Sequence, residues 1–185
     1  MITEIQFKES ASKIGCKVAA LKAVAEVESN GGGFLSTGEV KILFEPHIFW
    51  KQLRLAGIEP KVSDICYPIW GTKPYGKVSM QHEKLEKAVE INRVCALKSA
   101  SWGLFQIMGF NYKQCGCNSI QEFINKMCHS EDAQLELFVN YIINSHLDDE
   151  LRNEDWKGFA RGYNGASYAK NAYDTKLRKA FLKYS

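Results

Sequence analysis

A helical stripe of apolar residues that runs into three successive glycines constrains the fold of this 185-residue chain more than any other feature. Residues that recur at alternating steps of three and four lie on one face of a helix. The stripe consists of Ile14, Val18, Leu21, Ala25 and, at its end, Glu28. Because glycines follow at residues 31–33, and glycine commonly ends a helix, the pattern predicts one helix from residue 10 or 11 to residue 28.

Two glutamates near the end of this helix are expected on different faces. At about 100° per residue, Glu28 falls within about 40° of the centre of the stripe, whereas Glu26 points away and follows Lys22 by one turn. Burial and the negative end of the helix dipole both raise a carboxyl pKa. A glutamic acid that is protonated near neutral pH can serve as a general acid. Spacing alone leaves open the alternative that Glu28 reaches solvent where the helix ends.

The remaining sequence predicts a single domain over residues 1–185 that is mainly α-helical with a small β-hairpin element. The hairpin is expected between Phe34 and Phe44, and "EPHIFWKQL" predicts a helix with Pro46 in its first turn. Prolines and glycines scattered over residues 57–81 indicate a long loop or small lobe. A helix is expected near residues 82–98, and another begins after Ser119, with Glu122 as its capping-box partner. The next helix carries the apolar residues of positions 135–142 at helical spacing. Two C-terminal helices follow, separated by a glycine-containing break.

Charge and composition exclude several functions. The net charge of +3, from 24 basic and 21 acidic residues, is too small to indicate nucleic-acid binding. No segment approaches the roughly 20 apolar residues of a membrane span, and the N-terminus lacks the pattern of a secretory signal. We therefore expect synthesis in a cytoplasm, with the six cysteines as thiols. The cysteines lack the closely spaced ligand pairs that are typical of zinc sites, so no metal is expected.

Three short segments together point to a family. Glu28 lies in "VES", and "SWGLFQIMG" (residues 101–109) and "ARGYNGA" (residues 160–166) follow downstream. This order resembles the signature of goose-type lysozymes and soluble lytic transglycosylases. With "ILFEPHIFW" added, the pattern is most similar to the N-acetylmuramidase domain of bacteriophage endolysins, from about Ala20 to Phe181. The resemblance implies a lysozyme-like α+β fold with a cleft between lobes.

The same resemblance implies a pair of catalytic carboxylates. Glu28 would protonate the glycosidic oxygen, and Glu45 in "LFEPH" would assist the attacking water or stabilise the developing positive charge. Glu45 has the alternative interpretation of a carboxylate that interacts with a helix N-terminus, and Glu39 is the second choice for its role. His47 would either orient Glu45 or simply pack beside it.

Four further residues would line the sugar-binding cleft by the same resemblance: Ser101, Gln106, Tyr163 and Asn164. Each also has an ordinary structural interpretation. Ser101 can be a helix cap and Gln106 a hydrogen-bonded polar side chain, while Tyr163 can be a core residue and Asn164 a turn residue. Trp70 and Tyr75, in the irregular segment, are candidates for stacking on a sugar ring. Trp102, Phe105 and Ile107 are expected in the core.

The expected activity is hydrolysis of the β-1,4 bond between N-acetylmuramic acid and N-acetylglucosamine in bacterial peptidoglycan, with inversion. Inverting enzymes separate their two carboxyl groups by about 6.5–9.5 Å. The alternatives are a lytic transglycosylase, which forms 1,6-anhydro ends, and an inactive glycan-binding module. No cofactor is implied, a monomer is expected, and a holin would release the enzyme to the wall. The basic C-terminal helix either packs its apolar face or contacts an anionic envelope.

Overall fold

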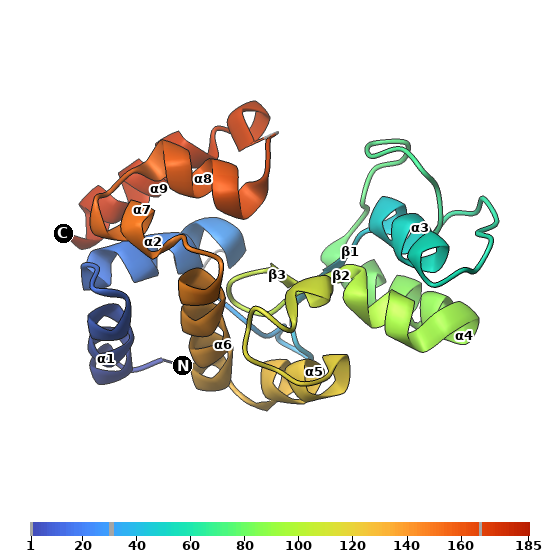
Figure 1. Ribbon diagram of the computed structural model, residues 1–185, viewed down its shortest axis with the longest axis horizontal. Coiled ribbons are helices and arrows are strands. Elements are labelled where there is room, and N and C mark those ends of the chain that lie inside the picture. Colours follow the sequence, from blue (N-terminus) through green and yellow to red (C-terminus); the bar gives the residue numbers. More distant parts are fainter. Residues whose placement is uncertain (1, 30–31, 167) are drawn as a thin grey trace.

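The computed structural model describes residues 2–29, 32–166 and 168–185, and helices make up most of it (Figure 1). The helices are α1 (Glu4–Ile14), α2 (Val18–Ser29), α3 (Pro46–Leu55), α4 (Gln81–Lys98), α5 (Ile120–His129), α6 (Glu131–Asn144), α7 (Asp148–Arg152), α8 (Trp156–Asn164) and α9 (Tyr173–Tyr184). The strands are β1 (Ile42–Phe44), β2 (Ala100–Trp102) and β3 (Ile107–Met108). Short 3₁₀ turns occur at η1 (Val78–Met80), η2 (Gly109–Asn111) and η3 (Tyr168–Asn171). The prediction of a mainly α fold with a small β element is confirmed.

The prediction of one helix from residue 10 or 11 to residue 28 is wrong, because two helices occupy this region. A capping box of Thr3 and Gln6 starts α1, and α1 ends at Gly15, whose φ of +81° lies in the left-handed region that glycine tolerates. The apolar spacing continues across this break because both helices bury their apolar residues in the same core. Helix α2 ends at Ser29, and Gly31, one of the three predicted terminators, lies outside the described residues.

The predicted hairpin between residues 34 and 44 is reduced to a single antiparallel bridge that joins Phe34 and Val40. The strand in this region, β1, pairs instead with β2, which places Leu43 opposite Ser101. Strand β3 adds to β2 on the other side, so the sheet is antiparallel in the order β1-β2-β3. The "SWGLFQIMG" segment therefore forms two strands and the tight turn between them.

Several local predictions are confirmed. Pro46 occupies the first position of α3, and an irregular segment links α3 to η1. The Ser119 hydroxyl accepts a hydrogen bond from the Glu122 amide, as in a capping box. The Glu122 carboxylate, however, accepts from the Asn118 amide instead of returning to Ser119, so only half of the predicted box forms.

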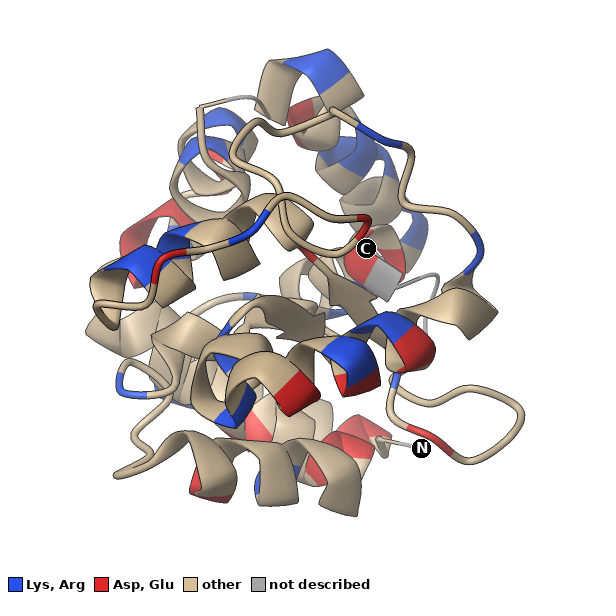
Figure 2. Ribbon diagram, turned by 90° about the vertical axis from the view of Figure 1, so that its right-hand side faces the viewer, with Lys and Arg blue, Asp and Glu red and all other residues tan. Residues whose placement is uncertain are grey.

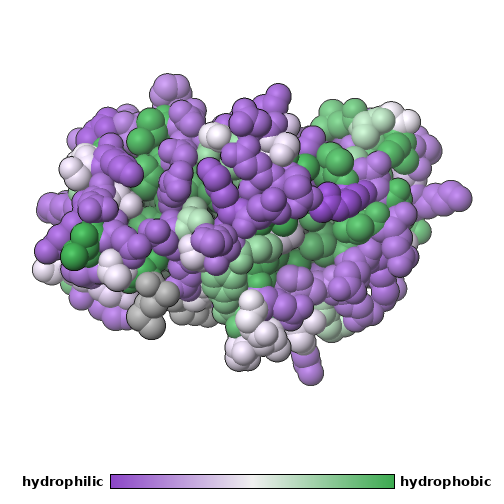
Figure 3. All heavy atoms as spheres, turned by 90° about the horizontal axis from the view of Figure 1, so that it is seen from below, coloured by the Kyte–Doolittle hydropathy of each residue, from purple (hydrophilic) through white to green (hydrophobic). Residues whose placement is uncertain are grey.

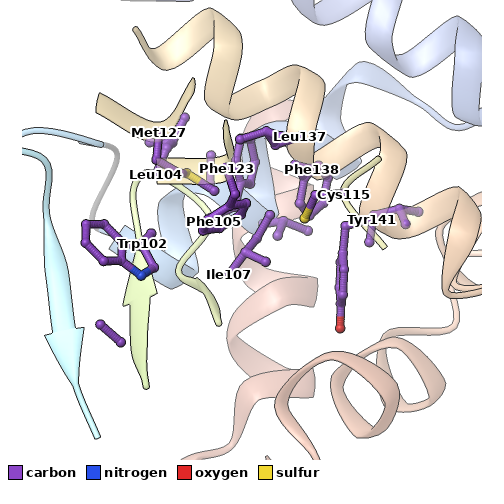
Figure 4. Packing of buried hydrophobic residues seen from close by; sticks show 14 of the residues in the cluster. Trp102, Leu104, Phe105, Ile107, Cys115, Phe123, Met127, Leu137, Phe138 and Tyr141 are labelled. Atoms are coloured by element: carbon purple, nitrogen blue, oxygen red, sulfur yellow. The ribbon is translucent and has the colours of Figure 1, made fainter. Parts of the chain in front are cut away.

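The part of the core drawn in Figure 4 lies between the β2–β3 turn and helices α5 and α6. Phe105 stacks on Phe138 with ring centroids 4.1 Å apart, and Trp102 is buried, so both serve as core residues and not as sugar platforms. Gln134 is fully buried beside the turn. Its side chain accepts from the Leu104 amide at 2.7 Å and donates to the Met127 carbonyl at 2.7 Å, which fixes the turn to α6.

The elements form two lobes on either side of the sheet. Helices α2, α8 and α9 lie in one lobe, and α3, α4 and the segment between α3 and η1 lie in the other (Figure 1). In the C-terminal helix α9, Leu177, Ala180 and Phe181 are buried, and α9 packs on α2, which agrees with the packing interpretation of that helix.

The surface carries both signs of charge. Basic and acidic residues are interspersed over the helices and loops (Figure 2). Hydrophilic residues dominate the face seen in Figure 3, with hydrophobic patches between them. Within the described residues, no helix combines the length and the apolar character that crossing a bilayer requires.

Candidate active site

A cleft of about 530 Å³ contains all the site residues that the sequence predicted. These are Glu28, Glu45, Ser101, Gln106, Tyr163 and Asn164. Glu28 comes from the last turn of α2, Glu45 from the junction of β1 and α3, and Asn164 from the end of α8. Elements that are far apart in sequence thus bring two carboxylates and several hydrogen-bonding side chains to one surface.

Glu28 is partly buried in this cleft. Burial raises the pKa of Glu28 from 4.5 to about 7, and it outweighs two opposing effects, the hydrogen bond from Asn164 and the positive charge of Lys176. The Asn164 amide nitrogen Nδ2 donates to Glu28 Oε1 at 2.9 Å. A substantial fraction of Glu28 therefore carries a proton at neutral pH, which is the state that a general acid needs.

Glu26, two residues earlier, has a different environment. Its Oε2 atom accepts hydrogen bonds from Lys183 and Tyr184 of α9, and the bond from Lys183 lowers the pKa of Glu26. Lys22, the partner that helical spacing suggested, pairs instead with Glu4 at 2.6 Å. Glu26 thus joins the C-terminal helix to α2 and does not line the cleft.

Glu45 faces the cleft from the start of α3. Although it occupies the N-cap position, its side chain makes no hydrogen bond to the amides of α3. Its Oε2 atom accepts from the Tyr75 hydroxyl at 2.6 Å and lies 3.3 Å from Nδ1 of His47. Only 15% of the Glu45 side chain is exposed. The contact with His47 favours the interpretation in which this histidine orients Glu45.

A chain of hydrogen bonds extends behind Glu45. Trp70 Nε1 lies 2.9 Å from the Tyr75 hydroxyl oxygen. Because an indole N–H can only donate, the Tyr75 oxygen accepts from Trp70 and directs its single hydrogen to Glu45. Burial, followed by the nearby Glu45 carboxylate, raises the pKa of Tyr75, so that its hydroxyl stays neutral and able to donate. Tyr75 is therefore the direct partner of Glu45.

The Trp70 ring also contacts the opposite wall of the cleft. It is 51% exposed, and the Lys170 ammonium of η3 lies 5.7 Å from its centroid. Because Trp70 and η3 belong to opposite sides of the cleft, this cation–π contact joins the two walls. An exposed indole at the edge of the cleft agrees with the predicted capacity of Trp70 to stack on a sugar ring.

Ser101 and Gln106 line the cleft together with the two carboxylates. The Ser101 hydroxyl donates to Gln106 Oε1 at 2.9 Å, and Gln106 Nε2 donates to the Gly103 carbonyl at 2.8 Å. The backbone of Gln106 has a φ of +47°, which is unusual for a residue with a side chain. These bonds hold the Gln106 side chain against its own turn, so both predicted residues line the cleft while they stabilise the β2–β3 connection.

Tyr163 combines its two predicted roles, cleft residue and core residue. Its hydroxyl donates to the Phe105 carbonyl at 2.6 Å, and its ring stacks on Phe159 with centroids 5.2 Å apart. Burial raises the pKa of Tyr163 well above its ordinary value. Tyr163 thus fixes α8 to the β2–β3 turn, directly beside the position of Asn164.

Sequence reasoning missed three cleft residues that follow the "ARGYNGA" segment. These are Tyr168, Asn171 and Tyr173. The pKa of Tyr173 is raised by burial and then by the charges of Glu28 and Glu45. The aromatic residues of "SYAKNAY" were the available signal. Glu39, the second choice for the partner carboxylate, is exposed, bonds to Thr37 at 2.9 Å and does not line the cleft.

Comparisons with known proteins give a matching family model and a similar solved structure. A family model described as N-acetylmuramidase matches residues 17–185. The chain is also similar to the crystal structure of the Burkholderia AP3 phage endolysin, with 38% sequence identity and a TM-score of 0.87. That match covers 99% of this chain and 70% of the endolysin chain. A comparison with curated proteins gives no match.

Proposed function

The chain belongs to the N-acetylmuramidase family, and we propose that it hydrolyses the β-1,4 bond between N-acetylmuramic acid and N-acetylglucosamine in bacterial peptidoglycan. The observation that supports this most directly is the unlike environment of two carboxyl groups in one cleft. Burial raises the pKa of Glu28 to about 7, whereas Glu45 Oε2 accepts a hydrogen bond from Tyr75 and lies 3.3 Å from Nδ1 of His47. Glycosidases use such a pair as an acid and a base.

Glu28 acts as the general acid in this proposal. A protonated carboxyl group has one oxygen that carries the proton and one that only accepts. Since Oε1 accepts from Asn164, the proton is directed to Oε2. The Oε2–H group then protonates the glycosidic oxygen as the bond to the anomeric carbon breaks, and Glu28 leaves this step as a carboxylate.

Glu45 acts as the general base in this proposal. The Tyr75 hydroxyl donates to Glu45 Oε2, which leaves Oε1 to accept a proton from water. That water attacks the anomeric carbon on the face opposite the leaving group, so the anomeric configuration inverts. Ser101 and Gln106 line the same cleft, and the exposed Trp70 ring is available to stack on a sugar ring.

The similarity to a phage endolysin extends this proposal to a biological role. We infer that the protein degrades the host cell wall at the end of a phage infection. A holin pore would give it access to the peptidoglycan. The proposed chemistry needs one chain, because both carboxylates and the cleft residues come from the same molecule.

Product analysis of digested peptidoglycan tests the proposed reaction. Wild-type protein should release muropeptides with reducing N-acetylmuramic acid ends, identified by mass spectrometry. Glu28→Gln should lower the rate by at least about 10²-fold, the usual effect of losing a general acid, and Glu45→Gln should also lower it strongly. Glu26→Gln is the matched control on the same helix and should retain the wild-type rate.

Other products would indicate other functions. Release of 1,6-anhydro ends would show a lytic transglycosylase, in which the muramic 6-hydroxyl replaces water. Binding of peptidoglycan by the wild-type chain without release of fragments would show a glycan-binding module. Wild-type turnover by Glu28→Gln would remove Glu28 from the mechanism.

A further inference from the structure

A second groove leaves the cleft beside Glu45 and follows the outer side of α3. His47 and Ile48 line both the cleft and this groove, so the two depressions are continuous. The remaining lining residues are Trp50, Lys51, Arg54, Leu55 and Pro68. Residues 47, 51 and 54 are four and three apart, which places them in one row along the helix. The row begins at His47, beside Glu45, and leads away from Glu45.

The charged residues that line this groove are all basic. None of its lining residues is acidic, although the chain as a whole has 21 acidic residues against 24 basic ones. Lys51 and Arg54 are exposed, and among the described residues neither takes part in an ion pair or a side-chain hydrogen bond. The groove thus presents two uncompensated cations beside the apolar surfaces of Trp50 and Leu55, a combination suited to an acidic and partly aliphatic ligand.

The glycan strand itself does not supply such a ligand. In peptidoglycan the N-acetylglucosamine and N-acetylmuramic acid rings are uncharged, and the carboxylates lie on the short stem peptide that the lactyl group of muramic acid carries. From His47 to Arg54 the row on α3 is about 10 Å long at 1.5 Å per residue. An extended peptide covers this length with about three residues at 3.3–3.6 Å each. The row therefore has room for about three residues of a stem peptide, and its positive charge is opposite to that of the stem carboxylates.

We propose that the groove on α3 binds the stem peptide of the muramic acid residue held in the cleft, with Lys51 and Arg54 paired to its carboxylates. This proposal rests on the proposed function, since it assumes that the cleft holds a peptidoglycan strand. It makes the protein selective for glycan that still carries its peptides over glycan that has lost them. Trp50 and Leu55 contact the aliphatic side chains of the stem.

Binding measurements in a Glu28→Gln background test the groove independently of turnover. The probes are soluble peptidoglycan strands that carry stem peptides and the same strands after an amidase has removed the peptides. Bare strands keep a free lactyl carboxylate on each muramic acid, so they control for general attraction between a polyanion and a basic protein. Replacing Lys51 and Arg54 together with alanine should raise the Kd for peptide-bearing strands about fivefold, as expected for two exposed ion pairs, and leave the Kd for bare strands unchanged.

A charge-matched control distinguishes an effect of the groove on binding from an effect of the protein's net charge. Lys8→Ala with Lys157→Ala removes two exposed cations of α1 and α8 that line neither depression, and it should change neither Kd. An equal loss of affinity for both probes, or no loss for peptide-bearing strands, would overturn the proposal. Cleavage of either substrate by the wild-type chain is a separate readout, so failure of the proposed reaction is distinguishable from failure of the groove.

Discussion

Asn164 Nδ2 lies 2.9 Å from Glu28 Oε1, and this hydrogen bond joins the end of α8 to the end of α2 across 136 positions of sequence. The other polar atom of the same amide, Asn164 Oδ1, is buried and has no hydrogen-bond partner among the described residues. Among the described residues, Glu28 is therefore the partner that orients this amide. It holds one carboxyl oxygen and leaves the second free toward the cleft.

Removal of this amide should change both the rate and its pH dependence. For the wild type, kcat/KM should fall as pH rises above about 7, because Glu28 then loses its proton. The Asn164 bond lowers the pKa of Glu28, so Asn164→Ala should move this decline to higher pH. Loss of the hydrogen bond should also lower the maximal rate about tenfold. A lower rate with an unmoved pH profile would show that Asn164 acts on the substrate instead.

The raised pKa of Glu28 should make the wild-type protein less stable at higher pH. Between pH 4.5 and about 7 the native state keeps a proton that the unfolded state has released, so the free energy of unfolding falls as pH rises through this window. The full difference is on the order of 3 kcal/mol. Glu28→Gln cannot ionise, and urea denaturation should find it more stable than the wild type at pH 8 but close to it at pH 4. Parallel pH profiles for the two proteins would contradict this expectation.

The hydrogen-bond chain from Trp70 through Tyr75 to Glu45 should affect kcat more than KM. Tyr75→Phe keeps the ring but removes the donor to a carboxylate, which should lower kcat about tenfold. Trp70→Phe leaves the Tyr75 hydroxyl free to rotate and should cause a smaller fall in kcat. Tyr112→Phe, outside the cleft lining, is the control and should retain the wild-type kcat. A Tyr75→Phe variant that changes only KM would show a role in sugar binding.

Gln134 should contribute to stability and not to chemistry. Gln134→Leu removes the partners of the Leu104 amide and the Met127 carbonyl, both in the core. Two buried polar groups left without hydrogen bonds should lower the free energy of unfolding by about 2–4 kcal/mol, measured by urea denaturation. Gln121→Leu on the exposed side of α5 should change it by less than about 1 kcal/mol. Equal effects of the two substitutions would show that the Gln134 bonds add nothing to the core.

The sequence by itself determined the local features of the protein. Helical spacing predicted α5 and α6, Pro46 predicted the start of α3, and the apolar stripe placed Glu28 on the buried side of its helix. These properties follow from backbone preference and burial, which act over a few residues and leave a periodic pattern. The same pattern predicted one helix where two occur, because the helices on both sides of the break at Gly15 bury their apolar residues in one core.

Only the tertiary structure decided which residues meet. Strand β1 pairs with β2, 58 positions away at Leu43 and Ser101, although its own sequence indicated a local hairpin. Glu45 and not Glu39 joins Glu28 in the cleft, and Asn164 reaches Glu28 from α8. Such contacts depend on how whole elements pack around a shared core, and residue spacing within one element carries no record of its distant neighbours.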